Sequence, residues 1–298
     1  MSMNTKCGFV AIMGAPNAGK STLVNSLVGS KVSIVTHKVQ TTRTRVMGIF
    51  MHDQTQIILI DTPGVFDPKK RLEKAMVRSA VSSIHDADAV AVIVDANLKD
   101  FTEAEKLLDK VLENGKTPFL ILNKIDLIEK EKLLAVASQL HKGRELGETF
   151  MISAIKSKGL DELRNCLATN MPESPWMYPE DQLSNVSMRM LASEVTREKV
   201  FLYLHDELPY SIMVDTESWE EFKNGSAKIT QTIYVQRDSQ KSIVLGKNGA
   251  QIKLIGQKAR EELEVMMGRQ VHLFLNVKVK ENWQDTPSYY KNMGLDFE

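Results

Sequence analysis

One motif near the N-terminus constrains this chain more than any other feature. It reads Gly14-Ala15-Pro16-Asn17-Ala18-Gly19-Lys20-Ser21 and fits the pattern G-x-x-x-x-G-K-[ST] between an apolar run and a segment with helical spacing. The glycines let backbone N–H groups turn toward phosphate oxygens, and the positive end of the following helix adds to that attraction. We expect Lys20 to reach the β- and γ-phosphates of a nucleotide and Ser21 to ligate Mg²⁺, with Thr22 in the same site.

The first half of the chain alternates strand-sized apolar runs with helical segments. The predicted strands are 8–13, 56–60, 89–94, 118–122 and 150–152, and the predicted helices begin near residue 20 and cover 102–113 and 159–168. Such alternation predicts an α/β domain with a mostly parallel sheet and helices on both faces. Ligands of such folds bind at the carboxyl ends of the strands, where the polar motifs of this chain also fall.

Further motifs follow three of these strands. Asp61-Thr62-Pro63-Gly64 is placed to hold Mg²⁺ through water and to sense the γ-phosphate through the glycine amide. Asn123-Lys124-Ile125-Asp126 is typical of guanine recognition, because Asp126 can accept hydrogen bonds from N1–H and from the exocyclic amine, a donor pair that adenine lacks. Lys124 would pack along the base, Asn123 would tie this loop to the phosphate site, and Ser153-Ala154 can offer a backbone amide to the base carbonyl. The motifs predict a P-loop GTPase domain that converts GTP and water to GDP and phosphate.

The loop before Asp61 is expected to act as a nucleotide-dependent switch. It contains four threonines, Thr36, Thr41, Thr42 and Thr44. One of them should ligate Mg²⁺ when the γ-phosphate is present, and we favour Thr42, with Thr41 second.

The predicted catalytic residues are Lys20, Thr42, Gly64 and Asn17. Many GTPases have a glutamine after the glycine of the second motif to orient the attacking water, but here the residue is Val65. Intrinsic hydrolysis should therefore be slow, or another group must position the water. Asn17 is a candidate ligand for K⁺ in place of an arginine finger; the alternative is that it only shapes the loop.

The pattern stops at Met171, after which three prolines in eight residues favour an extended connector. We therefore expect a GTPase domain at 1–171, a linker at 172–184, a second domain at 185–282 and an irregular tail at 283–298. The 298 residues suffice for two domains. No apolar run approaches the ~18 residues needed to span a bilayer, and we expect no export signal. We expect Cys7 and Cys166 to be reduced thiols.

The second domain is predicted to bind RNA. Gly246-Lys247-Asn248-Gly249 precedes a predicted helix at 250–267 and fits the G-x-x-G clamp with which KH domains grip about four nucleotides. Net charge is +0, but residues 223–280 contain 11 Lys and Arg against 4 Asp and Glu. Lys253 extends this basic surface. A predicted helix at 186–204, strands at 211–222 and 229–236 and an alternating strand at 271–279 complete an α+β domain.

Together the two domain signatures resemble the Era family of bacterial GTPases. The resemblance covers nearly the whole chain and includes Glu194-x-x-Arg197-Glu198-Lys199 and Glu207-x-Pro209-Tyr210. It implies a type II KH domain, binding of the 3′ region of 16S ribosomal RNA, and a role in rRNA maturation and small-subunit assembly. It also implies a cytoplasmic protein with some peripheral association with the inner membrane, and we expect a monomer.

Two other functions are compatible with this sequence. One is a membrane-associated signalling GTPase linked to cell-cycle control, whose basic domain binds acidic lipid or protein. The other is an RNA chaperone in which hydrolysis is incidental. Lysine and arginine clusters on an amphipathic helix would favour membranes, whereas G-x-x-G in a strand-rich context favours RNA.

Overall fold

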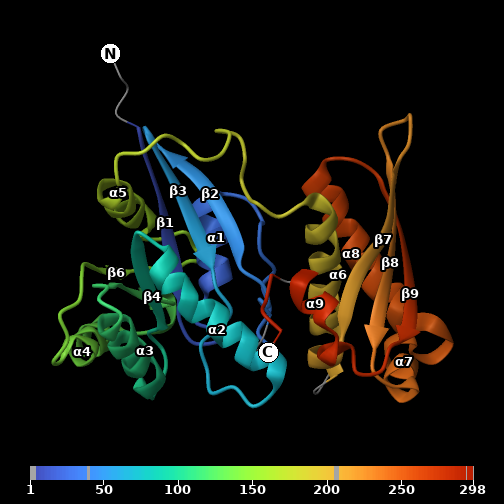
Figure 1. The fold of residues 1–298 in the computed structure, drawn as a ribbon, viewed down its shortest axis with the longest axis horizontal. Helices are drawn as coiled ribbons and strands as arrows, with labels where there is room; N and C mark the ends of the chain where they lie inside the picture. Colours follow the sequence, from blue (N-terminus) through green and yellow to red (C-terminus); the bar gives the residue numbers. More distant parts are fainter. Residues whose placement is uncertain (1–4, 39–40, 205–207, 293, 298) are drawn as a thin grey trace. The chain divides into compact units, whose positions relative to one another are not determined.

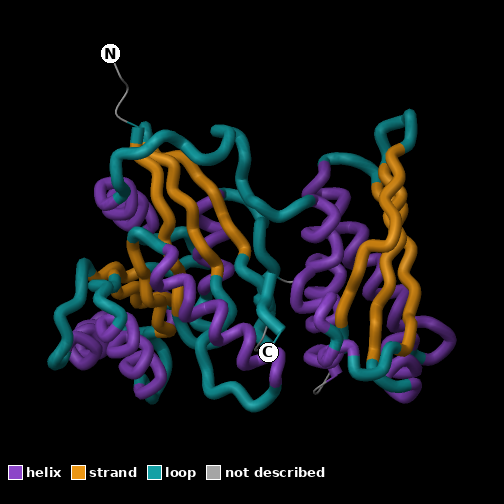
Figure 2. Tube along the Cα trace, viewed as in Figure 1, coloured by secondary structure: helices purple, strands orange, loops and turns teal. Residues whose placement is uncertain are grey.

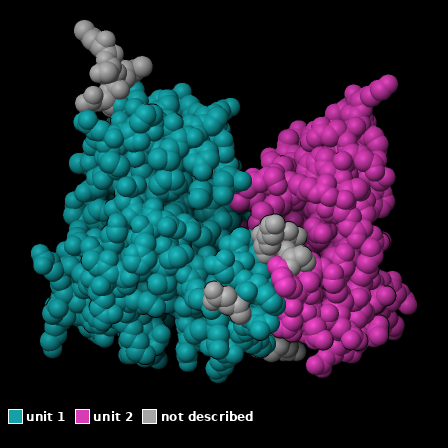
Figure 3. Space-filling view, in the orientation of Figure 1, with its two compact units in different colours: residues 1–33, 42–185, 290–298 teal, residues 34–41, 186–289 magenta. Residues whose placement is uncertain are grey.

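Figure 1 shows a computed structural model of the chain, which describes residues 5–38, 41–204, 208–292 and 294–297. Glu207, part of the resemblance above, lies outside these residues. The chain divides into two compact units (Figure 3). Unit 1 comprises Met1–Ser33, Thr42–Asn185 and Tyr290–Glu298, and unit 2 comprises Ile34–Thr41 and Val186–Tyr289. The division predicted from the sequence differs in two places: it assigns 34–41 to the first domain and 283–298 to one separate tail.

A six-stranded sheet forms the centre of unit 1, in the order β2-β3-β1-β4-β5-β6 (Figure 2). Neighbouring strands are parallel except β2 and β3, so the predicted mostly parallel sheet is confirmed. The strands are β1 (Lys6–Met13), β2 (Val46–His52), β3 (Thr55–Asp61), β4 (Ala89–Asp95), β5 (Phe119–Asn123) and β6 (Thr149–Met151).

Helices cover both faces of this sheet, because successive residues of a strand point to opposite sides. On β1, Ile12 belongs to the core cluster shared with α1 and α5, whereas Met13 belongs to the cluster shared with α2, α3 and α4. The helices are α1 (Lys20–Val28), α2 (Arg71–Asp86), α3 (Thr102–Glu113), α4 (Lys130–His141) and α5 (Leu160–Asn170). The range of α3 agrees with the prediction, but β2, α2 and α4 were not anticipated.

The predicted linker at 172–184 lies along the edge of the sheet. The N–H of Ile49 on edge strand β2 donates to the Leu183 carbonyl (2.8 Å), and Gly48 forms a bridge with Ser184. The connector is extended, as its prolines suggested, and it is hydrogen-bonded to unit 1. It therefore covers backbone groups of the edge strand that would otherwise be open to pairing with another chain.

Unit 2 is an α+β fold with a three-stranded sheet in the order β7-β8-β9. Strands β7 and β8 are antiparallel, and β8 and β9 are parallel. Residues of α6 and α8 share core clusters with strand residues, which places both helices against the sheet. Helix α8 has the predicted bounds, whereas α7 was not predicted. The elements are α6 (Met188–Tyr203), β7 (Met213–Glu221), β8 (Ala227–Val235), α7 (Asp238–Leu245), α8 (Ala250–Met267) and β9 (Val271–Val279).

The C-terminal residues are more regular than predicted. Instead of an irregular tail they form the 3₁₀ turn η4 (Trp283–Asp285) and helix α9 (Pro287–Asn292). Trp283 and Tyr290 are fully buried, and the Trp283 indole N–H donates to the Ser211 carbonyl (2.9 Å). Burial of two large aromatic side chains gives this short segment an order that its polar composition does not suggest.

Cys7 and Cys166 are free and buried, and burial raises the pKa of both thiols. Within the described ranges, no helix is long and apolar enough to cross a membrane. The same residues contain no cluster of three or more His, Cys, Asp or Glu side chains able to hold a metal ion.

Gln56 is predicted to hold the linker on unit 1. Its fully buried side chain accepts the N–H groups of Met177 (2.9 Å) and Tyr178 (3.0 Å) and donates to the Tyr178 carbonyl (2.8 Å). Gln56→Ala should lower the free energy of unfolding by about 2 kcal/mol and expose 172–184 to proteolysis, because backbone groups lose their partners. Urea unfolding and limited proteolysis measure both effects. The exposed neighbour Gln54, changed to alanine, serves as control, and an equal effect there would contradict the role of Gln56.

Candidate active site and nucleic-acid interface

The phosphate motif forms the loop between β1 and α1, in a conformation that needs its glycines. Gly19 has φ 102°, and a Cβ there would lie 2.2 Å from Asn123 Nδ2. A Cβ on Gly14 would lie 2.5 Å from the Ile93 carbonyl oxygen. Asn17 has φ 63°, which asparagine tolerates better than most residues. The loop leads into α1, which begins at Lys20. The free N–H groups at the N-terminus of this helix can bind an anion.

Lys20 is buried within this loop. Its Nζ donates to the carbonyl oxygens of Gly14 (3.0 Å) and Ala15 (2.9 Å). Burial lowers the pKa of Lys20 to about 8, although the nearby charge of Asp61 acts in the opposite direction. A cation that is held by carbonyl groups and poorly solvated is well suited to receive phosphate oxygens.

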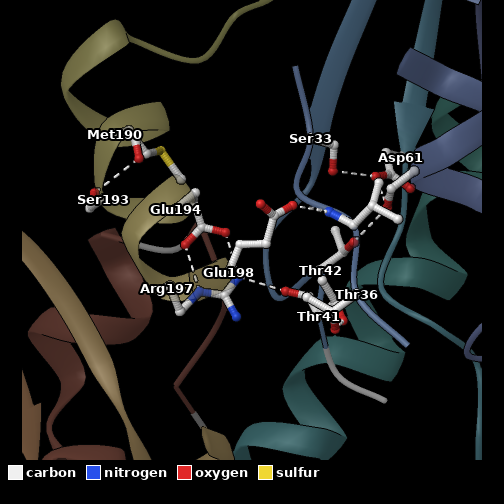
Figure 4. A network of polar contacts seen from close by, with 12 residues as sticks. Ser33, Thr36, Thr41, Thr42, Asp61, Met190, Ser193, Glu194, Arg197 and Glu198 are labelled. Atoms are coloured by element: carbon white, nitrogen blue, oxygen red, sulfur yellow. Dashed lines mark hydrogen bonds and ion pairs between the residues drawn. The ribbon is translucent and has the colours of Figure 1, made fainter. Parts of the chain in front are cut away.

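The structure brings the three predicted metal ligands together, with Ser21 between Asp61 and Thr42. Ser21 Oγ donates to Asp61 Oδ2 (2.7 Å) and lies 2.9 Å from Thr42 Oγ1. Ser33 also donates to Asp61 Oδ2 (2.7 Å), as Figure 4 shows. The carboxylate is fully buried, its other oxygen has no hydrogen-bond partner among the described residues, and burial raises its pKa. An unsatisfied carboxylate oxygen beside two hydroxyls suits Mg²⁺, which prefers oxygen ligands.

The structure separates the two candidate switch threonines. Thr41 Oγ1 donates to the Lys38 carbonyl (2.7 Å) and lies 2.6 Å from Thr36 Oγ1, so this hydroxyl is engaged within its own segment. Thr42 is instead the threonine beside Ser21. Thr44 is buried. The role of Thr42 as a Mg²⁺ ligand stays a prediction.

The Asp61–Gly64 motif abuts the phosphate loop. The Thr62 hydroxyl donates to the Ile12 carbonyl (2.8 Å), and the N–H of Val65 donates to the Gly14 carbonyl (3.2 Å). A Cβ on Gly64 would lie 2.9 Å from a carbon of the Pro16 ring, so only glycine fits here without a shift. The Val65 side chain packs against the core and cannot orient a water molecule.

Asn123 connects three loops of the site. Its Nδ2 donates to the Ala18 carbonyl in the phosphate loop (2.9 Å), and its Oδ1 accepts the N–H of Ala154 (3.0 Å). The first contact agrees with the predicted tie between the base and phosphate loops. The second corrects the expectation for Ser153-Ala154: the Ala154 amide is bonded to Asn123, because this buried side chain needs a partner at each end.

The sequence analysis missed two charged residues near the guanine motif, Asp95 and Lys156. Lys124, at φ 65°, places its Nζ 2.6 Å from Asp95, and Lys156 Nζ lies 3.4 Å from Asp126. The side chains of Ser153 and Lys156 lower the pKa of Asp126, which keeps the predicted guanine acceptor ionised. Asp95 is the last residue of β4. It therefore also lies at the carboxyl end of a strand, where ligands of such folds bind.

The G-x-x-G sequence of unit 2 forms a tight turn between α7 and α8. Gly246, Asn248 and Gly249 all have positive φ, of 69°, 52° and 76°. A Cβ on Gly246 would lie 2.6 Å from the Gln251 Cβ, so the close approach requires glycine. Helix α8 begins immediately afterwards at Ala250, which places its N-terminal amides beside the turn.

A groove of about 430 Å³ lies between α8 and β9, and its lining begins at Ile252 in the first turn of α8. Its walls include Lys253, Gly256, Gln257, Arg260 and Phe274. Phe274 is 53% exposed, so its ring is accessible, and the cations Lys253 and Arg260 line the same groove. Sequence analysis found Lys253 but not the groove, because the groove depends on how α8 packs on β9.

The basic block of unit 2 is divided between paired and unpaired cations. On the sheet, Lys228, Arg269 and Lys278 form ion pairs with Glu220, Glu221 and Glu217 at 3.2, 2.7 and 2.8 Å. By contrast, Lys247 and Lys253 are exposed and have no ion pair with any described residue. Lys223, Arg237 and Lys241 also have no ion pair with a described residue, so positive charge is available to a polyanion at the turn and the groove and at these three places as well.

Triphosphate affinity should fall as pH rises through about 8, because Lys20 binds phosphate as the ammonium and its pKa is lowered to about 8. Well above that pH the dissociation constant for GTP should rise about tenfold per pH unit, since the protein must take up a proton on binding. Calorimetric titrations between pH 6.5 and 9 measure this. Lys20→Arg is the control, because its guanidinium stays charged. Identical pH profiles for both proteins would contradict the assignment.

Two family models match this chain. The family described as 50S ribosome-binding GTPase matches residues 9–124, and the KH domain family matches residues 207–284. GTPase Era of Afipia carboxidovorans is 56% identical over 294 residues, which is 98% of this chain and 95% of that protein. GTPase Era of Brucella suis biovar 1 is 53% identical over 293 residues, covering 98% of this chain and 94% of that protein.

Two solved structures are similar over almost the whole chain. Era in complex with MgGDPNP and nucleotides 1506–1542 of 16S ribosomal RNA is 38% identical with a TM-score of 0.91, covering 97% of this chain and 99% of that one. A variant of Aquifex aeolicus Era bound to GDP·AlF4⁻ is 37% identical, with the same TM-score and coverage. The similarity extends over nearly the full length of this chain and of its relatives, and the chain belongs to the Era family of GTPases.

Proposed function

We propose that this GTPase binds the 3′ region of 16S ribosomal RNA through unit 2 and acts in rRNA maturation and small-subunit assembly. Its reaction is the hydrolysis of GTP to GDP and phosphate. Support comes from the relative of the same two-domain organisation whose solved structure contains nucleotides 1506–1542 of 16S ribosomal RNA.

The observation that carries the RNA proposal is the Gly246–Gly249 turn at the start of α8, together with the groove that α8 forms with β9. Two glycines bring the backbone close to a ligand, the α8 N-terminus supplies amides, and Lys247 and Lys253 supply charge that no described acidic residue neutralises. Single-stranded RNA offers phosphates for the turn and bases that can stack on an aromatic side chain such as Phe274. An acidic protein would use the charge but not the narrow backbone approach.

We propose Mg²⁺ as the cofactor of the GTPase site, held by Ser21, Thr42 and Asp61. The three side chains are already within hydrogen-bond distance of one another in the pairs given above, and one Asp61 oxygen has no partner among the described residues. When bound, Mg²⁺ neutralises charge on the phosphate oxygens. Lys20 and the α1 N-terminus add the remaining positive field, and Gly64 brings its backbone close to the same place.

Location and assembly state stay predictions. We propose a cytoplasmic, monomeric protein, because ribosomal subunits are assembled in the cytoplasm, and a peripheral contact with the inner membrane remains an expectation. In the part of the chain that the structure describes, no specific observation favours the membrane-associated signalling function over RNA binding.

RNA binding should depend on the unpaired cations. Lys253→Gln should weaken binding of the full chain to a labelled RNA of nucleotides 1506–1542 and reduce the slope of log affinity against log salt by about 0.7. Fluorescence anisotropy at several salt concentrations, with GDP and with a non-hydrolysable GTP analogue, measures this. Lys278→Gln is the matched control, because its ammonium lies 2.8 Å from Glu217.

The turn itself is tested by a second variant. The double substitution Gly246→Asp and Gly249→Asp adds repulsive charge and blocks the positive φ, so it should abolish specific RNA binding while GTP affinity is unchanged. RNA retention at the wild-type level would place the binding site elsewhere in the chain.

We also propose that K⁺ stimulates hydrolysis with Asn17 as a ligand, supported by the exposed side chain of Asn17 in the phosphate loop. Turnover in KCl should exceed turnover in NaCl at equal ionic strength. The variant Asn17→Gly distinguishes a K⁺ ligand from a residue that only shapes the loop. Glycine accepts φ 63° but has no side-chain carbonyl to bind the ion. If Asn17 only shapes the loop, the glycine variant will keep the wild-type response to K⁺.

A further inference from the structure

The loop that follows β6 is held in one shape by its own backbone. Ser153 and Lys158 exchange two backbone hydrogen bonds, each 3.1 Å long, and the N–H of Lys156 donates to the Ser153 carbonyl (3.2 Å). The loop ends at Gly159, where a Cβ would lie 2.7 Å from the Met151 carbonyl oxygen. The position of Lys156 is therefore set by main-chain contacts, all of them within unit 1.

The end of β6 also holds the guanine motif. The N–H of Ile125 donates to the carbonyl of Ile152, the residue before Ser153 (3.2 Å). Asp126, the predicted guanine acceptor, follows Ile125 in the 3₁₀ turn η1 (Ile125–Leu127). Backbone hydrogen bonds to two consecutive residues thus fix the loops that carry Asp126 and Lys156 next to each other.

Lys156 is the cation that accompanies Asp126. Its Nζ lies 3.4 Å from Asp126 Oδ2, and no other described residue forms an ion pair with this carboxylate. Lys124, the lysine of the guanine motif itself, is paired with Asp95 at 2.6 Å. The Asp126 side chain is 15% exposed, whereas that of Lys156 is 64% exposed. A partly buried carboxylate is thus balanced by a single ammonium group that reaches it from the surface.

The length of this contact indicates how Lys156 acts. Hydrogen bonds between an ammonium and a carboxylate are about 2.7–2.9 Å long. At 3.4 Å the ammonium contributes mainly its charge and leaves lone pairs of the Asp126 carboxylate to N–H donors. Lys156 and a guanine base can therefore interact with Asp126 at the same time.

A bound base increases the importance of this charge. When water solvates the carboxylate, an ion pair with so exposed a lysine contributes little to stability. A guanine ring that covers Asp126 displaces this water and leaves the carboxylate facing neutral N–H donors. The attraction between two charges increases as the dielectric constant falls, and a covered carboxylate without a cation is destabilised. Lys156 should therefore stabilise the nucleotide complex more than the free protein.

We propose that Lys156 is a positioning residue of the guanine site, which acts as the counter-ion of Asp126 and increases the affinity for guanine nucleotides. The proposal rests on the predicted role of Asp126 and on residues of unit 1 alone. Because the same base is bound in GTP, in GDP and in the transition state, Lys156 contributes equally to all three. Its loss should change affinity and KM and leave kcat unchanged.

The test combines calorimetric GDP binding with steady-state GTP turnover by the full chain. Lys156→Gln should raise the dissociation constant for GDP and KM for GTP about fivefold each, with kcat within twofold of wild type. Lys156→Arg should return both values to within twofold of wild type, because the positive charge is restored. Lys158→Gln is the matched control and should change neither value more than twofold. It removes the same charge from the same loop, but the exposed Lys158 side chain has no ion pair with a described residue.

A double substitution separates the role of Lys156 from that of Asp126. Asp126→Asn should shift preference from guanine to xanthine nucleotides. Adding Lys156→Gln to it should leave xanthosine diphosphate affinity unchanged, because no carboxylate remains to be balanced.

Three results would overturn the proposal. They are a GDP dissociation constant within twofold of wild type for Lys156→Gln, an equal rise for Lys158→Gln, and an effect of Lys156→Gln that persists in full without the carboxylate of Asp126. In each case a loss of GDP affinity in Asp126→Asn would leave the predicted role of Asp126 standing. Unchanged GDP affinity in Asp126→Asn would instead contradict that role, and the proposal for Lys156 would fall with it.

Discussion

The buried carboxylate of Asp61 is the constraint on which the nucleotide site depends. A carboxylate without exposure is destabilising by several kcal/mol unless hydrogen bonds and a nearby cation compensate. Ser21 and Ser33 both donate to one of its oxygens, and Lys20 lies close enough to favour its charged form. The other oxygen has no partner among the described residues. This incomplete compensation is understandable if the site is built for a cation, because a fully satisfied carboxylate would have no lone pair left to offer.

The sequence predicted the loops that carry this site because their information is local. Gly14 and Gly19 stand where a Cβ would collide with Ile93 and Asn123, so the motif itself encodes the backbone path. Relations between strands are not local. The pairing of Lys124 with Asp95 depends on the register of β4 with β5, in which Asp95 lies opposite Asn123. No single motif contains that register, and the same holds for the groove formed by α8 on β9.

The fold was predictable where hydrophobic pattern is continuous. Strands buried on both faces appear as apolar runs, and α3 and α8 have the bounds that their spacing predicts. Strand β2 was missed because it is an antiparallel edge strand containing Gly48, and α2 because serines interrupt its apolar stripe. The membership of Ile34–Thr41 in unit 2 could not be predicted at all. It results from single backbone hydrogen bonds to Arg197 and Glu198, whose partners are more than 150 residues away (|i−j| of 156 and 163).

Backbone hydrogen bonds to α6 hold the segment Ile34–Thr41 within unit 2. Fixing the backbone of a loop costs about 1–2 kcal/mol per residue in conformational entropy, and hydrogen bonds such as these to α6 offset part of that cost. The same contacts continue inside unit 2: Glu198 binds Lys199, and Lys199 binds Glu262 on α8, two residues after Arg260 of the groove. Contiguity of this kind is not evidence of coupling by itself. Within unit 2, α6 contacts the segment Ile34–Thr41 through Arg197 and Glu198, and it contacts α8, which lines the groove, through Lys199.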